Sequence, residues 1–302
     1  LTREAGFYFY FSRKIRELRE SGHEGTARAY ASSLRSMQRY LGKKDFPFIK
    51  LSSRIISDYQ GKLLASGICD NTIGFYLHNI KALFRKGCRE MGLELPCPFR
   101  DISIKTKKTL KRSLDPVVIK TLSAIELEKD SPLSLARDIF MFSFYTRGMS
   151  FVDIALLKKR HVFPGEICYR RHKTDQLMRV GINKEISRIL ERYKNVPGEY
   201  IFPLFPAERD PYAGYRNAYH RIRYSLGKIS RVIGLEFPLR LHAARHSWAT
   251  IAKVNGASVH VIGECLGHTS EKTTRIYLKE LDHSALDAVN NQVADFILAV
   301  DD

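Results

Sequence analysis

One C-terminal stretch of this sequence gathers side chains that could do chemistry on a phosphate. It contains His242 and Arg245, then His268, then Tyr277. An arginine fork matches the oxygens of a phosphate, an imidazole moves protons near neutral pH, and a phenol can act as a nucleophile. This combination predicts an enzyme that breaks a phosphodiester by forming a bond from tyrosine to phosphorus.

The spacing of these residues supports a common site. His242 lies three positions before Arg245, so the two share a face of a helix, and a base beside a phosphate ligand suits proton removal from the nucleophile. Gly267 precedes His268 and is expected to end a helix and to expose the imidazole. His246 is assigned a structural role.

Three other classes of protein compete with this interpretation. His242 and His246 are four positions apart and could share a zinc ion, although Ala243 stands where the His-Glu-x-x-His motif has its glutamate. A DNA-binding protein without catalysis is the second alternative. A type IB topoisomerase, which uses similar chemistry on one duplex, is the third.

The charge of the chain predicts a polyanionic partner. The 302 residues carry a formal net charge of +18, and such a surface field attracts phosphates. Residues 1–112 hold 23 Lys and Arg against 10 Asp and Glu, a net charge of +13, whereas the remainder holds 27 against 22, a net charge of +5. We therefore expect an N-terminal part that grips DNA and a C-terminal enzyme core.

The same composition speaks against a membrane or an oxidising compartment. No stretch approaches the roughly 18 apolar residues of a spanning helix, and no signal-peptide pattern opens the chain. The 5 cysteines are odd in number and form no Cys-x-x-Cys pair, which indicates reduced thiols. A cytoplasmic protein associated with the nucleoid is expected.

Apolar periodicity predicts a first domain that is a small helical bundle, with helices at 9–20, 25–41 and 53–65 and a fourth from 71 or 72 to 91. The basic stretch 104–112 lacks an amphipathic period and is expected to be an interdomain linker. We place the domain boundary near Lys111.

The second domain is predicted to be mainly helical with one antiparallel β-hairpin. Its strands are expected at 166–171 and 177–182, joined by a polar turn that carries Lys173. Ser150 and Asp153 have the spacing of a capping box at the start of a helix that runs toward 158. The remaining helices are expected at 116–127, 133–145, 183–194, 212–233, 241–254, 258–265, 271–278 and 283–298.

These residues, in this order, resemble the tyrosine recombinases of the phage integrase family. The pattern is a lysine on a hairpin, Lys173, then His242-x-x-Arg245, then Leu-Gly-His ending at His268, then Tyr277. The resemblance implies a helical core-binding domain, 1–111, and an α+β catalytic domain, 112–302. The phrases at 25–28, 146–153 and 244–249 are similar to recombinases on mobile elements of anaerobic gut bacteria.

One position departs from the family pattern. The family places its first catalytic arginine two residues after a glycine, and here Gly148 is followed by Met149 and Ser150. Our hypothesis is that Arg147, just before this glycine, supplies the missing guanidinium. Asp153 would then orient Arg147 or the hairpin.

The resemblance implies a site-specific recombinase that cuts and rejoins DNA through a 3′-phosphotyrosyl link, with neither a cofactor nor a metal. Tyr277 would attack, Arg245 and Arg147 would hold the phosphate with help from His268, His242 would take the proton of the nucleophile, and Lys173 would protonate the leaving oxygen.

The implied partner is double-stranded DNA that carries a specific recombination site. The implied assembly is a homotetramer on DNA, joined by exchange of the C-terminal segment 281–300. Accessory DNA-bending proteins are expected as additional partners.

Overall fold

The computed structural model describes residues 6–105, 107, 113–205, 211–268, 270–278, 291, 293 and 294, apart from the side chains of 211–213, 276 and 277. The chain divides into two compact units, Leu1–Thr109 and Leu110–Asp302. Lys111 and almost all of 281–300 lie outside the described residues, so the exact domain limits and the exchanging segment stay predictions. No helix in the described part is long and apolar enough to cross a membrane.

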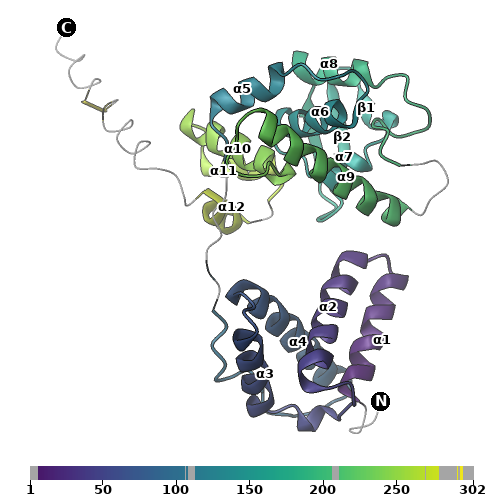
Figure 1. Cartoon of the computed structure of the whole chain (residues 1–302), viewed down its shortest axis with the longest axis vertical. Coiled ribbons are helices and arrows are strands. Elements are labelled where there is room, and N and C mark those ends of the chain that lie inside the picture. Colours follow the sequence, from purple (N-terminus) through teal and green to yellow (C-terminus); the bar gives the residue numbers. More distant parts are fainter. Residues whose placement is uncertain are drawn as a thin grey trace. The chain divides into compact units, whose positions relative to one another are not determined.

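The first unit is a four-helix bundle (Figure 1). It consists of α1 (Phe7–Glu20), α2 (Glu24–Leu41), α3 (Ser53–Ala65) and α4 (Asp70–Glu90), with a short 3-10 helix η1 (Phe48–Lys50) between α2 and α3. Its core is rich in fully buried aromatic rings from α1, η1, α3 and α4, including Phe7, Tyr10, Phe48 and Tyr59. These rings fill the space that the predicted apolar stripes enclose.

The end of the first unit is tied to the start of α4. The amide of Lys107 donates to Oδ1 of Asn71 at 2.7 Å, and Nδ2 of Asn71 donates to the carbonyl of Lys107 at 2.9 Å. The ammonium of Lys107 also pairs with Asp70 at 3.0 Å. Part of the predicted linker 104–112 is therefore held on the helical bundle.

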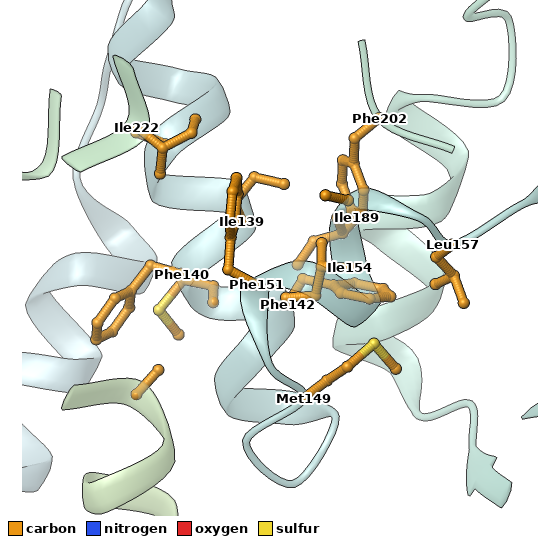
Figure 2. Packing of buried hydrophobic residues seen from close by; sticks show 14 of the residues in the cluster. Ile139, Phe140, Phe142, Met149, Phe151, Ile154, Leu157, Ile189, Phe202 and Ile222 are labelled. Carbon is orange, nitrogen blue, oxygen red and sulfur yellow. The ribbon is translucent and has the colours of Figure 1, made fainter. Parts of the chain in front are cut away.

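The second unit surrounds the helix α6. Its helices are α5 (Pro116–Ala124), α6 (Pro132–Tyr145), α7 (Phe151–Ala155), α8 (Lys184–Arg192), α9 (Pro211–Val232), α10 (Leu241–Val254), α11 (Val259–Leu266) and α12 (Glu271–Leu278). Contacts from α6 reach α5, α7, α8, α9 and α10 (Figure 1). Phe140 and Phe142 of α6 are fully buried, and the ring of Phe142 packs edge to face on Phe202 (Figure 2).

The sheet contains one strand more than predicted. β2 (Glu166–Arg170) and β3 (Leu177–Gly181) form the expected antiparallel hairpin, and β1 (Val162–Phe163) pairs with the outer side of β2. A two-residue strand is too short for an alternation of polar and apolar residues to reveal it. The chain is thus mainly helical with a small antiparallel sheet, as expected.

The capping box predicted at Ser150 is wrong in detail. Ser150 is the N-cap of α7, but its side chain makes no capping hydrogen bond. Instead its hydroxyl donates to Oδ2 of Asp153 at 2.6 Å. The hydroxyl therefore points toward the carboxylate and not toward the amides of the first helical turn. Helix α7 also ends at Ala155, earlier than expected.

Two glycine substitutions in the first unit should have opposite effects on stability. A Cβ at Gly87 of α4 would lie 2.5 Å from ring atoms of Phe48, whereas nothing lies within 4 Å of a Cβ at Gly61 of α3. Gly87→Ala should lower the free energy of unfolding by about 1–3 kcal/mol through overpacking. Gly61→Ala should raise it by about 0.5–1 kcal/mol, since alanine loses less backbone entropy in a helix.

Chemical denaturation of the full chain would measure both changes. Equal effects of the two variants would contradict the packing described for Phe48.

Candidate active site

Arg245 is a buried charged group of the candidate site. It lies on α10 and is 7% exposed. Its Nη1 donates to the carbonyl of Gly148 at 2.9 Å, and its Nη2 donates to the carbonyl of Leu266. A guanidinium stays protonated in proteins and has donors only, so these two carbonyls fix the orientation of the fork.

The approach of Gly148 to Arg245 requires a glycine. Gly148 has φ of 75°, and a Cβ on it would lie 2.5 Å from Cγ and 2.9 Å from Cα of Arg245. A side chain at this position would be strained by the backbone conformation and would also collide with α10. The turn between α6 and α7 can therefore touch the base of Arg245 directly.

His268 is held in one tautomer by two neighbours. Its Nε2 lies 3.1 Å from Nη2 of Arg245, and its Nδ1 lies 2.9 Å from Oγ1 of Thr274. Arginine can only donate, so Nε2 is the acceptor and the ring proton lies on Nδ1, from which it is donated to Thr274. Burial, followed by the positive charges of Arg245, Arg171 and Lys173, lowers the pKa of His268 to about 4.

Thr274 links this imidazole to the helix that carries the predicted nucleophile. Thr274 is fully buried on α12, and Tyr277 lies on the same helix three positions later, which is close to one turn. The side chain of Tyr277 is outside the described part of the structure. The backbone of α12 nevertheless places position 277 about one turn after Thr274, the residue that contacts His268.

The hairpin contributes two cations to the surroundings of His268. Lys173 lies in the exposed turn after β2, as predicted, and its charge acts on His268. Arg171 directly follows β2, and its Nη1 donates to the carbonyl of Gly267. Arg171 was missed in the sequence, although strand alternation places it on the same side of β2 as the buried Tyr169.

Arg147 lies close to this group but makes a different contact. Its φ of 59° is unusual for a residue with a side chain, and its Nη1 lies 3.4 Å from the carbonyl of Arg179 on β3. Burial, followed by the charge of Asp153, raises the pKa of Tyr169. The charges of Arg171, Arg245 and Arg147 only partly oppose this rise. The hypothesis that Arg147 binds the phosphate stays a prediction.

Asp153 connects the hairpin to the turn before α7. It is 5% exposed and accepts hydrogen bonds from the hydroxyl of Ser150 and from the amide of His172 at 2.8 Å. Of the two roles expected for Asp153, its contacts match the one that orients the hairpin.

His242 lines a cavity together with Arg245. The cavity has a volume of about 320 Å³, and aromatic rings of Phe151, Tyr215 and Tyr219 form one part of its wall. The exposed ring of His242 packs edge to face on that of His246, with centroids 4.4 Å apart. Among the described residues, no three His, Cys, Asp or Glu side chains are grouped as a metal site would require.

The low pKa of His268 predicts how its ring titrates. The folded pKa of about 4 lies below the ordinary value of 6.5, so the unfolded chain takes up the proton first as the pH falls. The contribution of His268 to stability is therefore complete above pH 6.5 and is lost as the pH falls toward 4.

NMR titration of the DNA-free protein would test this prediction, with His268→Asn used to assign the ring signal. The signal should stay unchanged down to about pH 5. A midpoint near the ordinary value of 6.5 would contradict the contacts described for the ring.

Comparison with curated proteins finds bacterial recombinases among the relatives. The chain is 26% identical over 226 residues to tyrosine recombinase XerC of Shewanella oneidensis, covering 72% of this chain and 70% of the relative. It is 24% identical over 262 residues to tyrosine recombinase XerD of Pseudomonas putida, covering 84% and 86%. The more specific resemblance to recombinases of anaerobic gut bacteria stays a prediction.

Comparison with solved structures finds an integrase whose fold is similar to that of this chain. A lambda integrase dimer bound to a COC′ core site matches with a TM-score of 0.68 and 16% identity, over 92% of this chain and 98% of that one. A family model described as phage integrase SAM-like domain matches residues 6–100. The model of the phage integrase family itself matches residues 113–283, more than half of the chain, and the protein therefore belongs to the phage integrase family.

Proposed function

We propose that this chain is a site-specific recombinase that cuts and rejoins DNA with Tyr277 as its nucleophile. The observation that carries the proposal is the series of contacts from Arg245 through His268 to Thr274. It joins a buried guanidinium, an imidazole of fixed tautomer and the short helix on which Tyr277 lies. The tyrosine recombinases among the relatives support the same reaction.

Arg245 is the main ligand of the scissile phosphate in this proposal. Its guanidinium would donate to the non-bridging oxygens, and these bonds strengthen as negative charge builds up in the pentacoordinate transition state. The free protein has already oriented the guanidinium through two carbonyls.

The covalent step exchanges one ester for another. The Tyr277 oxygen forms a bond to phosphorus while the bond from phosphorus to the 5′ oxygen breaks. His242 accepts the phenol proton, and Lys173 gives a proton to the departing 5′ oxygen, which becomes a hydroxyl. The 5′ hydroxyl of a second strand later reverses these steps, so neither a nucleotide cofactor nor a metal is required.

Double-stranded DNA that carries a recombination site is the substrate in this proposal. The net charge of +13 on residues 1–112 would hold the first unit on the phosphate backbone through release of counterions. Two duplexes, each cut on both strands, require four subunits, and segment 281–300 is proposed to join neighbours by exchange. Nucleoid association and accessory DNA-bending proteins are further parts of this proposal.

Tyr277→Phe should abolish covalent attachment of the protein to DNA, because the ring remains while the attacking oxygen is lost. The substrate would be a nicked duplex that traps the cleaved state. It would carry a site selected for binding from a random DNA pool. Denaturing electrophoresis should show a slowly migrating adduct, linked at the DNA 3′ end, for the parent protein only.

Tyr224→Phe is the matched control, since Tyr224 is an exposed tyrosine of α9 that packs near Lys228, and it should form the adduct at the parent rate. An adduct formed equally by Tyr277→Phe would disprove the assigned nucleophile. Binding without any adduct in the parent would favour the DNA-binding alternative. Relaxation of supercoils without exchange between duplexes would favour the topoisomerase.

A further inference from the structure

We infer that Arg171 is the second arginine that binds the scissile phosphate. It comes from the hairpin, whereas the family's arginine would stand at position 150, directly before α7. The inference rests on the proposed function, because it names a second ligand for the same scissile phosphate. It assigns the role of the family's first catalytic arginine, whose position Ser150 occupies, to a residue 21 positions later in the sequence.

Arg171 and Arg245 converge on the same end of one helix. Nη1 of Arg171 donates to the carbonyl of Gly267, and Nη2 of Arg245 donates to the carbonyl of Leu266, the preceding residue. These are the last carbonyls of α11, which no longer have partners inside the helix and lie at its negative end. The two guanidinium groups thus donate to consecutive carbonyls, and the inference places the scissile phosphate beside both of them.

The backbone at Gly267 makes this approach possible. Gly267 has φ of 62° in the left-handed region, and a Cβ there would lie 3.3 Å from Cδ and from Nη1 of Arg171, and 3.0 Å from Sδ of Met178. The hairpin therefore packs directly on the turn that precedes His268. Arg171 adds to the positive charge that, after burial, lowers the pKa of His268.

Ser150, which stands where the family has its first catalytic arginine, helps to hold Arg171 in place. The hydroxyl of Ser150 donates to one oxygen of Asp153, and the other oxygen accepts the amide of His172, the neighbour of Arg171. Asp153 is buried, so each of these hydrogen bonds lies in a region of low dielectric. Ser150 thus secures the strand end that carries the replacement guanidinium.

Neighbouring arginines are less suited to this role. Arg170 points to the other side of the strand, where its side chain is 64% exposed and pairs with Asp175. Arg147 contacts the carbonyl of Arg179 on β3. Of the three, Arg171 is the one with a contact to the residue next to His268.

The first test compares cleavage by Arg171→Ala, Arg147→Ala and Arg170→Ala on the nicked duplex described above. Arg171→Ala should form the adduct about 10²–10³-fold more slowly than the parent, which is the typical loss for one donor to a charged transition state. Arg170→Ala should cleave at the parent rate. Gel-shift affinity within about threefold of the parent would separate a loss of cleavage from a loss of DNA binding.

The second test removes a charge from the DNA. A methylphosphonate at the scissile position replaces one non-bridging oxygen with a methyl group, and each stereoisomer would be assayed separately. If Arg171 neutralises that oxygen, the defect of Arg171→Ala should shrink at least tenfold on one isomer. A merely structural role would leave the defect equal on phosphate and methylphosphonate.

Melting temperatures of all variants would be measured alongside the cleavage rates. If Arg171→Ala does not fold, Arg171→Lys carries the same tests, since it keeps one donor and the charge but loses the planar fork. Cleavage by the folded variant within threefold of the parent, or equal defects on both substrates, would overturn the inference. An inactive parent would instead overturn the proposed function, and this inference with it.

Discussion

The site depends on how a permanently charged guanidinium is kept inside the protein. Arg245 cannot neutralise itself by losing a proton, so its burial is tolerable only with acceptors in fixed directions. The structure supplies the carbonyls of Gly148 and Leu266, which are far apart in the sequence. The turn after α6 and the end of α11 must therefore both pack on α10 before the charge is accommodated, and this requirement couples folding of the second unit to assembly of the site.

The helices around His268 rely more on polar contacts than the rest of the unit. Ala249, Ile262, Leu266 and Leu278 form a small buried cluster separate from the main core. A cluster of this size contributes far less burial than the core around α6. The hydrogen bond from His268 to Thr274 and the contact of Arg171 with Gly267 therefore hold α11 and α12 near the hairpin, and the groups proposed for catalysis also serve as structural links.

Much of this fold could be predicted because its patterns are local. The periods of α3, α10 and α12 gave their limits directly, and the turn residues gave the hairpin. The Leu-Gly-His motif also predicted a helix end at Gly267, where φ is 62°. The role of Arg171 could not be seen in the same way, because its partner lies 96 positions away. The cap at Ser150 was predicted wrongly because the capping pattern is local in the sequence. The carboxylate of Asp153, which Ser150 contacts, also binds the amide of His172 in the hairpin.

The contacts among Ser150, Asp153 and the amide of His172 have a consequence for substitution at position 150. Placing an arginine at position 150 by one mutation would delete the hydroxyl and put a bulky cation against the buried carboxylate. The aspartate would then be drawn from the strand end toward the new charge before any benefit was gained. A single change from serine to arginine at this position would therefore also remove one of the two hydrogen bonds that hold the carboxylate beside the hairpin.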